Sequence, residues 1–365
     1  MAKLSFSPSL LARCTKDPRR GVFENGKVLS NATVDTGPAP SPLPPSRPPL
    51  LFFRGALGDF VLFLPVVDAF LRRFGSVELV APEAGRWLYG LHPGVVFSRS
   101  DDVFWSKLHQ DTADARLIER FSSRPAVILT TADPEGHLRR RLVGWGLAGA
   151  VRWHPPFPIG GVPVLAHHHA LIRQTLDDDI PLGPPSLPRR QRPVPVLRED
   201  SGAPILTPYI LLHPGSGGGH KNWPLAGFLE VRERLLQRKI TAVMIFGPAD
   251  EVVLNEAQMA VGATTGWVTG RNLGEAVDWL RGASVYVGLD SGLSHVAQAC
   301  GVPSVLLVPE KNRAFWQGAE PLGRVLYAEN IKNDPTPDEV LRAFDDLRKD
   351  SSIKDRERLE GKDPA

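Results

Sequence analysis

The feature that most constrains the fold is an alternation of short apolar runs with longer helix-forming stretches, which starts at residue 50 and restarts at residue 209. The runs are rich in Val, Ile, Leu and Phe, as β-strands are, and helical patterns of about ten residues separate them. This order is typical of parallel sheets joined by right-handed helical crossovers. A proline- and arginine-rich stretch at 180–204 interrupts the alternation, and 365 residues suffice for two domains of about 150 residues each. The sequence therefore predicts an α/β protein with two parallel-sheet units.

The positions of the elements follow from the same pattern. Strands are expected at 50–54, 77–81, 126–130, 209–213, 241–247, 284–288, 304–308 and 325–327. Helices are expected at 59–74, 112–122, 136–147, 166–177, 224–238, 250–261, 273–281, 292–300 and 337–348. The predicted division is a disordered basic tail (1–49), a first α/β domain (50–180), a linker (181–205), a second α/β domain (206–335), a C-terminal helix (336–349) and a disordered tail (350–365).

The charge and cysteine content exclude several classes of protein. The net charge is +3, and the segment 1–49 alone carries seven Lys and Arg against three acids, which leaves the remainder close to neutral. A nucleic-acid partner is therefore not expected. Two cysteines give no disulfide framework, and no apolar run reaches the length of about 18 residues that a membrane helix needs. Without a secretory signal, we expect a cytoplasmic protein.

The first motif is RGALGDFVLFLP, residues 54–65. Its glycines, Gly55 and Gly58, allow a tight turn and the close approach of another molecule. Asp59 stands at the expected N-cap of the following helix, and capping alone is the simpler interpretation. The alternative is that Asp59 is a general base that faces a bound ligand, where its apolar neighbours would strengthen it as a base.

The second motif is LHPGSGGGHKNWP, residues 212–224, which follows a predicted strand. Glycine amides, the nearby Lys221 and the start of a helix at Pro224 together suit a phosphate group. A flexible turn with a solvated lysine is the simpler interpretation. The segment lacks the Gly-Lys-Ser/Thr ending of a Walker A loop, which argues against an NTPase or kinase.

The third motif is VGLDSGLSHVAQACGVPSV, residues 287–305. The amides of Ser291, Gly292 and Leu293 open a helix and can bind a diphosphate, while Asp290 can hold sugar hydroxyls. His295 lies one turn into this helix, where a packed core histidine is the simpler interpretation.

Two other clusters are assigned to solvated faces. His167, His168 and His169 precede Asp177, Asp178 and Asp179, but adjacent histidines point in different directions on a helix, so no metal site is expected. Arg139, Arg140 and Arg141 are interpreted as an ordinary exposed face.

In this order, the three motifs resemble glycosyltransferase family 9, the heptosyltransferases of lipopolysaccharide core synthesis, over roughly residues 50–348. The matching segments are Arg54 with Ala56-Leu57-Gly58-Asp59, His213 to Gly217 with Lys221-Asn222-Trp223-Pro224, and Asp290-Ser291-Gly292 with His295 and Gly301-Val302-Pro303. The sequence departs from the family at Gly217-Gly218-Gly219-His220, where Ser, Pro or Thr is more usual, and at 309–316, where PEKNRAFW replaces a Gly-Pro-Thr-like turn.

The resemblance implies a GT-B fold, in which two Rossmann-like domains face each other across a cleft, with the acceptor on the first domain and the donor on the second. It implies inverting transfer without a metal or cofactor, from a nucleotide sugar (ADP-heptose is the expected donor) to a lipopolysaccharide-core-like or lipid-linked glycan. Peripheral contact with the inner membrane surface is part of this expectation. The implied roles are Asp59 as base; Ser216, Gly217, Lys221, Ser291, Gly292 and Leu293 on the diphosphate; Asp290, His295, Asp250 and Glu251 on the donor sugar or nucleotide; and Arg54, Gly55 and Gly58 on the acceptor side.

Two further functions remain open from the residues. A GT-B sugar-nucleotide epimerase would need additional carboxylates or histidines around the sugar. A non-catalytic GT-B module would bind nucleotide sugar or glycan, but it would not require the base.

Overall fold

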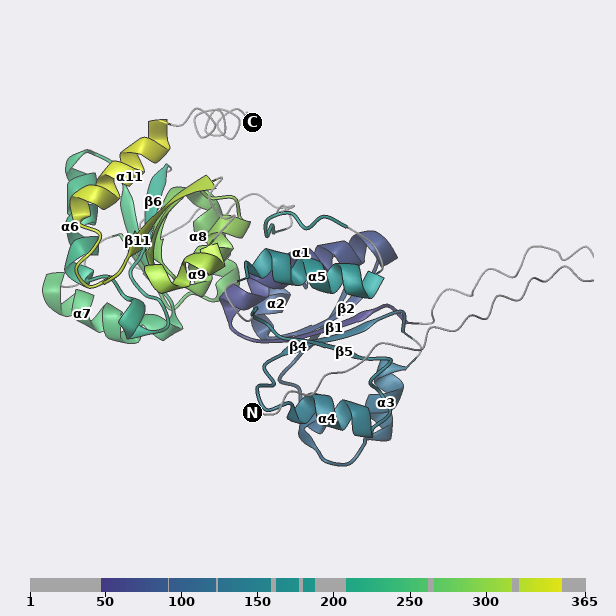
Figure 1. Cartoon of the computed structure of the whole chain (residues 1–365). Helices are drawn as coiled ribbons and strands as arrows, with labels where there is room; N and C mark the ends of the chain where they lie inside the picture. Colours follow the sequence, from purple (N-terminus) through teal and green to yellow (C-terminus); the bar gives the residue numbers. More distant parts are fainter. Residues whose placement is uncertain are drawn as a thin grey trace, which may run out of the picture. The chain divides into compact units, whose positions relative to one another are not determined.

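The computed structural model describes residues 47–90, 92–122, 124–158, 162–176, 180–187, 208–261, 266–316 and 322–349 (Figure 1). The predicted tails, apart from residues 47–49, and most of the predicted linker lie outside these ranges. Within them, no helix combines the length and the apolar character that crossing a membrane requires.

The first sheet has five parallel strands in the order β3-β2-β1-β4-β5. They are β1 (Leu50–Arg54), β2 (Val77–Ala81), β3 (Val95–Arg99), β4 (Val127–Thr131) and β5 (Arg152–His154). The helices are α1 (Leu57–Phe74), α2 (Glu83–Leu88), α3 (Ala115–Phe121), α4 (His137–Gly144) and α5 (Val164–Leu176), with a 3-10 segment η1 (Val103–His109). Strands β3 and β5 were not predicted.

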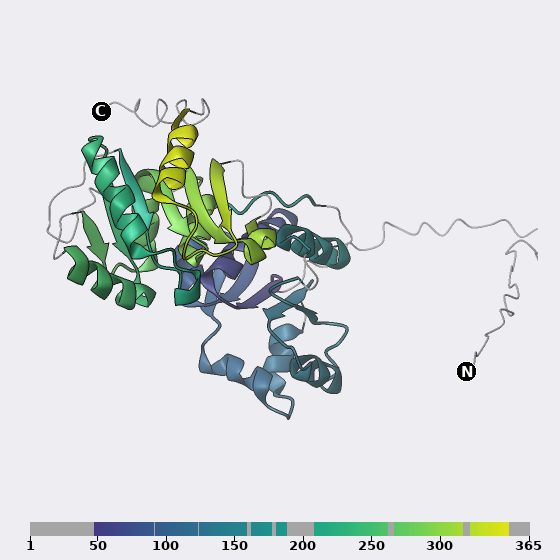
Figure 2. The same ribbon diagram turned by 60° about the vertical axis from the view of Figure 1, so that its left-hand side comes forward.

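Helices cover both faces of this sheet, with α1, α2 and α5 on one side and α3 and α4 on the other (Figures 1 and 2). The β1 run LLFF is apolar at every position for this reason. Leu51 and Phe53 belong to the core beneath α1, whereas Leu50 and Phe52 belong to the core beneath α3 and α4. A strand buried on both faces loses the polar alternation of a half-exposed strand.

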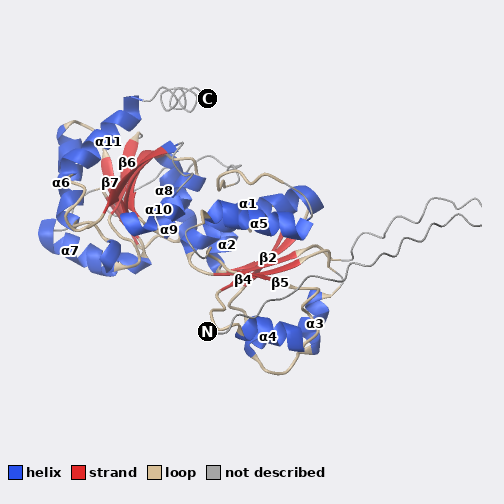
Figure 3. Ribbon diagram, in the orientation of Figure 1, coloured by secondary structure: helices blue, strands red, loops and turns tan. Residues whose placement is uncertain are grey.

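The second sheet has six parallel strands in the order β11-β10-β9-β6-β7-β8 (Figure 3). They are β6 (Tyr209–His213), β7 (Ala242–Phe246), β8 (Trp267–Thr269), β9 (Ala283–Leu289), β10 (Ser304–Pro309) and β11 (Gly323–Ala328). The helices are α6 (Leu225–Gln237), α7 (Glu251–Val261), α8 (Leu273–Gly282), α9 (Gly292–Ala299), α10 (Arg313–Trp316) and α11 (Pro337–Lys349), with 3-10 segments η2 (Gly219–Lys221), η3 (Pro248–Asp250) and η4 (Glu310–Asn312). Strand β8 was not predicted.

Both sheets reverse their strand order at the strands that precede the motifs. The order runs outward from β1 to β2 on one side and to β4 on the other, and from β6 to β7 and to β9 in the same way. Ligands of open α/β sheets bind beyond the carboxyl ends of the strands at such switch points. The first motif follows β1, the second follows β6, and the third follows β9, so all three occupy these positions.

The two sheets belong to one compact unit and share a hydrophobic core. Helix α1 packs against α9, and α2 packs against α8. The start of the predicted linker is packed as well, since the Leu187 amide donates to the Ala299 carbonyl (2.9 Å).

Candidate functional site

The first turns of α1 and α9 are in contact, and two glycines make the contact possible. A Cβ on Gly58 would lie 2.8 Å from Cδ2 of His295, and a Cβ on Gly292 would lie 2.9 Å from Cβ of Leu57. Real Cβ atoms do not approach other atoms so closely, so any other residue would force the helices apart. The space beside Gly58, expected on the acceptor side, is therefore filled by α9.

Asp59 lies in the third position of α1 and is not its N-cap. The helix begins at Leu57 after Ala56, and the Ala56 amide donates to Oδ2 of Asp59 (3.1 Å). The prediction that Asp59 caps the helix from outside is wrong, because the helix starts two residues earlier than the apolar pattern indicated. Asp59 still satisfies an end amide of the helix, from within its first turn.

The environment of Asp59 makes it a stronger base than an ordinary aspartate. Burial raises the pKa of Asp59 to about 6, against the opposing effects of the Ala56 amide and the Lys221 ammonium, while the negative charge of Asp290 adds to the rise. A carboxyl group with a pKa near neutrality suits general base catalysis. Asp59, which follows a strand of the first sheet, thus interacts electrostatically with Lys221 and Asp290, which follow strands of the second sheet.

Asp290 is the centre of a hydrogen-bonded cluster. Lys221 Nζ lies 3.1 Å from its Oδ2, Asn312 Nδ2 donates to the same oxygen (2.6 Å), and Trp316 Nε1 donates to Oδ1 (2.9 Å). Burial disfavours the carboxylate, but Lys221 and these donors outweigh it and hold the pKa of Asp290 below its usual value. Asp290 is therefore ionised and fixed in position.

Asn312 and Trp316 were not predicted as site residues. The sequence had marked their segment, 309–316, only as a departure from the family pattern. The structure shows that this segment replaces the expected turn with two donors to Asp290. The one available signal was a tryptophan in a segment that borders the expected donor site.

His295 is a packed histidine, as the simpler interpretation held. Its ring is stacked on that of Trp316, with the centroids 3.9 Å apart and the planes 7° from parallel. Burial lowers the pKa of His295 to about 4, although the nearby Asp290 opposes this shift and Lys221 adds to it. The imidazole is therefore neutral, and it fills the space between Gly58 and Trp316.

The N-terminus of α9 has the geometry of an anion site. Ser291 is the N-cap, and its Oγ accepts from the Ser294 amide (3.3 Å). Helix geometry leaves the amides of Gly292 and Leu293 without acceptors inside the helix, at the positive end of the helix dipole. This arrangement fits a diphosphate group.

The glycine loop after β6 is shaped by its own contacts. Gly217 has a φ of +64°, a left-handed conformation that favours glycine. Ser216 Oγ lies 2.9 Å from the Gly218 carbonyl and 2.5 Å from Oδ1 of Asn222, and Lys332 Nζ donates to the Gly219 carbonyl (2.9 Å). The loop is thus ordered around Lys221, which is partly exposed.

A buried hydrogen-bond chain connects this loop to α9. Ser294 Oγ lies 2.9 Å from the hydroxyl of Tyr286, which lies 3.2 Å from Nδ1 of His213. His213 Nε2 lies 2.9 Å from Oδ2 of Asp250. Sequence reasoning missed this chain, because its members are distant in the sequence and three of them lie within strands or helices that read as core.

Asp250, which was expected near the donor ribose, packs against the glycine loop that follows β6. The Gly247 amide donates to its Oδ2 (2.7 Å), and a Cβ on Gly215 would lie only 1.7 Å from its Oδ1. Burial opposes ionisation, but the bond from His213 outweighs it and keeps the pKa of Asp250 below its usual value. Glu251 follows as the exposed first residue of α7.

Arg54 lies exposed at the end of β1, with NH1 3.1 Å from Nε2 of His109. Burial, together with the positive charges of Arg54 and Arg141, lowers the pKa of His109. Gly55 is exposed next to Arg54, and a Cβ there would lie 3.5 Å from Oδ2 of Asp59. The first turn of α1 is therefore bordered by positive charge.

The prediction of a solvated face for the histidine run is wrong. His168 is fully buried and His167 is half-buried, and both approach His154 of β5. The expectation that adjacent histidines diverge on the helix fails here, since the ring centroids of His167 and His168 lie 5.4 Å apart and the edge strand supplies a third imidazole that the sequence pattern did not reveal. Asp177, Asp178 and Asp179 lie outside the described residues.

Comparisons with known proteins identify the family to which the chain is similar. The family model described as glycosyltransferase family 9 (heptosyltransferase) matches residues 150–340, just over half of the chain. Lipopolysaccharide heptosyltransferase 1 of Pseudomonas aeruginosa is 32% identical over 162 residues, which are 42% of this chain and 43% of that protein. Lipopolysaccharide heptosyltransferase 3 of Escherichia coli is 26% identical over 163 residues, 43% of this chain and 46% of that protein. The matched segment thus spans less than half the length of either relative.

Solved structures share the fold over most of the chain. The glycosyl transferase family 9 structure from Veillonella parvula has a TM-score of 0.63 at 16% identity and covers 83% of this chain and 97% of its own. The ADP-heptose lps heptosyltransferase II of E. coli has a TM-score of 0.63 at 19% identity and covers 85% and 99%. The predicted GT-B class of α/β fold is confirmed.

Proposed function

Because the chain belongs to glycosyltransferase family 9, we propose that it transfers a heptosyl group from ADP-heptose to a hydroxyl of a lipopolysaccharide-core-like or other lipid-linked glycan. The names of the curated relatives support this substrate class. The observation that carries the proposal is the electrostatic link between Asp59, with its pKa near 6, and the Lys221–Asp290 pair. It brings a base and an anion-binding group together from the two sheets.

In the proposed reaction, Asp59 accepts the proton of the acceptor hydroxyl while the oxygen attacks the anomeric carbon. The pKa near 6 leaves Asp59 ionised at neutral pH and more basic than an exposed aspartate. A single displacement breaks the bond to the diphosphate and inverts the anomeric configuration. The exposed guanidinium of Arg54 would face the acceptor.

The second sheet would stabilise the leaving group. Lys221, the loop at Ser216 and Gly217, and the first amides of α9 supply positive charge and donors for a diphosphate. They would perform the task that a divalent cation performs elsewhere, so we propose transfer without a metal or cofactor. Asp290, held by Trp316, would orient hydroxyls of the donor sugar.

The test is the variant Asp59→Asn, which keeps the size of the side chain and its bond to Ala56. We expect transfer to be abolished while ADP-heptose binding, measured by calorimetry, stays within about twofold of wild type, since a base contributes about 10²–10⁴-fold to rate and little to binding. A variant that turns over like wild type would show that Asp59 is not the base.

Donor and metal are tested together by thermal shift. We expect ADP-heptose to stabilise the protein more than GDP-, UDP- or dTDP-sugars, through mass action, and the shift to persist in EDTA.

Incubation of donor without acceptor, followed by a search for an epimerised sugar nucleotide, separates transfer from epimerisation. A cytoplasmic place of action with peripheral membrane contact belongs to the same proposal, and co-sedimentation with anionic vesicles tests the contact.

A further inference from the structure

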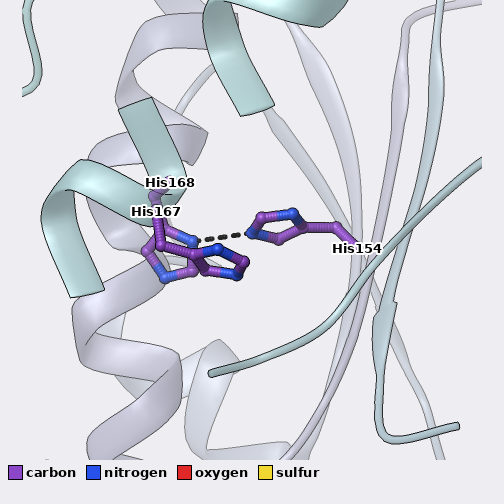
Figure 4. A group of neighbouring side chains, drawn as sticks. All are labelled: His154, His167 and His168. Atoms are coloured by element: carbon purple, nitrogen blue, oxygen red, sulfur yellow. Dashed lines mark hydrogen bonds between the residues drawn. The ribbon is translucent and has the colours of Figure 1, made fainter. Parts of the chain in front are cut away.

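Three histidine side chains converge from two elements of the first sheet unit (Figure 4). His154 is the last residue of β5, and His167 and His168 lie in the first half of α5. One ring nitrogen of each lies within 4.8 Å of the others. His154 Nε2 is 3.0 Å from Nδ1 of His168, and the ring centroids of His154 and His167 are 4.1 Å apart.

The cluster is built into the interior. His168 is 0% exposed and His154 is 6% exposed, and the His168 ring packs edge-on against Phe63 of α1, with the centroids 5.6 Å apart. Solvent therefore has little access to the rings of His154 and His168.

The hydrogen bonds within the cluster prepare it for a ligand. His167 Nε2 lies 2.9 Å from the Pro155 carbonyl, to which it can only donate, so Nδ1 of this ring carries the lone pair. A ring N–H fixed by a backbone carbonyl is the usual arrangement of a metal-binding histidine. His154 and His168 share a hydrogen bond, but Nε2 of His168 is buried and finds no hydrogen-bond partner in the described part of the chain, so the bonds within the cluster leave one polar atom unsatisfied.

The spacing fits a small tetrahedral cation. Zinc–nitrogen bonds of about 2.0–2.1 Å place tetrahedral ligand atoms roughly 3.3 Å apart. The pair formed by His154 and His168 is already close to this value at 3.0 Å. A ring nitrogen of the half-buried His167 lies within 4.8 Å of the other two, and the ring must turn out of its stack on His154 to complete the set.

We propose that His154, His167 and His168 form a three-coordinate protein site for Zn²⁺, with water as the fourth ligand, which ties edge strand β5 to helix α5. Imidazole nitrogens suit Zn²⁺, whereas Mg²⁺ and Ca²⁺ require oxygen ligands. The ion stabilises the packing of α5 against α1, the helix that carries Asp59. It takes no part in the sugar transfer proposed above, so failure of either proposal leaves the other unaffected.

The test uses the full chain without a histidine tag, stripped of metal by EDTA and dialysed. We expect calorimetry with ZnCl₂ and elemental analysis to give one zinc per chain, and Tm to rise by roughly 5 °C when free zinc exceeds Kd a hundredfold. Co²⁺ is expected to give the visible d–d absorption of a four-coordinate site with nitrogen ligands. This spectrum tests the site in the wild-type protein, independently of any variant.

The variants assign the ligands. His167→Gln, at the half-buried position, is expected to remain folded and to lose zinc uptake and the cobalt spectrum, and His154→Gln is expected to do the same. The matched control is His169→Gln, the next position on the same helix, which is expected to retain both. Absence of zinc uptake by folded wild-type protein, uptake that survives His167→Gln and His154→Gln, or equal loss in His169→Gln would each overturn the proposal.

Discussion

Replacing Asp59 by Asn is expected to stabilise the folded protein at the same time as it removes the proposed base. The pKa of Asp59 lies near 6 in the folded chain against 3.8 for an unburied aspartate. Each pKa unit corresponds to about 1.36 kcal/mol, so ionised Asp59 costs the fold about 3 kcal/mol at full strength. Solvent screens part of this cost because the side chain is only half-buried, and we expect Asp59→Asn to gain about 1–2 kcal/mol.

The stability gained by Asp59→Asn is expected to grow as the pH rises. Because the folded pKa is raised, the folded state binds more protons than the unfolded state between about pH 3.8 and 6, and the stability contributed by the protonated form is lost as the pH rises. The gain in the Asn variant is therefore absent below pH 3.8, about half developed at pH 5 and complete above pH 7. Asn can still accept the Ala56 amide bond, so the helix end is preserved.

The assay is urea denaturation of wild type and Asp59→Asn at pH 5 and pH 8, with Asp68→Asn as the matched control. Asp68 lies on the same helix, and burial also raises its pKa to about 6, but it contacts the Tyr89 hydroxyl and not the Lys221–Asp290 pair. We expect Asp68→Asn to gain stability with rising pH while transfer is retained. An Asp59→Asn variant that is less stable than wild type at pH 8, or whose gain does not grow with pH, would refute the reasoning.

Four further substitutions test the packing and the charges. Gly58→Ala is expected to lower the free energy of unfolding by about 1–3 kcal/mol through overpacking against α9. Gly144→Ala, with open space around it, is expected to raise it by about 0.4–1 kcal/mol in the same denaturation assay. Equal effects of the two substitutions would show that Gly58 is not in close contact with α9. Trp316→Phe keeps the stacked ring but deletes the donor to Asp290, and we expect donor Kd to rise about tenfold by calorimetry, with an unchanged Kd as the contrary result. Glu78→Gln leaves two arginines, one of them buried, without their carboxylate and is expected to cost about 3–5 kcal/mol, so a loss below 1 kcal/mol would contradict the burial argument.

The sequence predicted the central strands and missed strands at the sheet edges. Strands β1, β4, β6 and β9 are buried on both faces, so their continuous apolar runs stand out. The missed strands, β3, β5 and β8, are all edge strands, and β5 and β8 have only three residues each. An edge strand has one paired neighbour and more exposure, so its pattern is weaker.

The three motifs lie at the ends of strands, as the sequence predicted, but the sequence did not reveal all of the contacts around them. Asp59, Lys221 and Asp290 lie close enough to interact electrostatically, as their proposed roles require. The donors Asn312 and Trp316 reach Asp290 through tertiary contacts more than twenty positions along the chain, and no local pattern encodes such a distance. The histidine cluster was missed for the same reason, because one of its three members comes from a separate strand.

The glycine contact between α1 and α9 has a consequence for how the enzyme can diversify. Two helix ends that meet at glycines, each against one packed side chain of the other helix (His295 and Leu57), set the separation of the carboxylate and the anion-binding turn. Segments around this fixed pair, such as the one that ends at Trp316, can therefore change in sequence to suit another sugar or base while the reacting atoms keep their spacing. We therefore expect substitutions in these segments to change substrate range more than the spacing of the reacting groups.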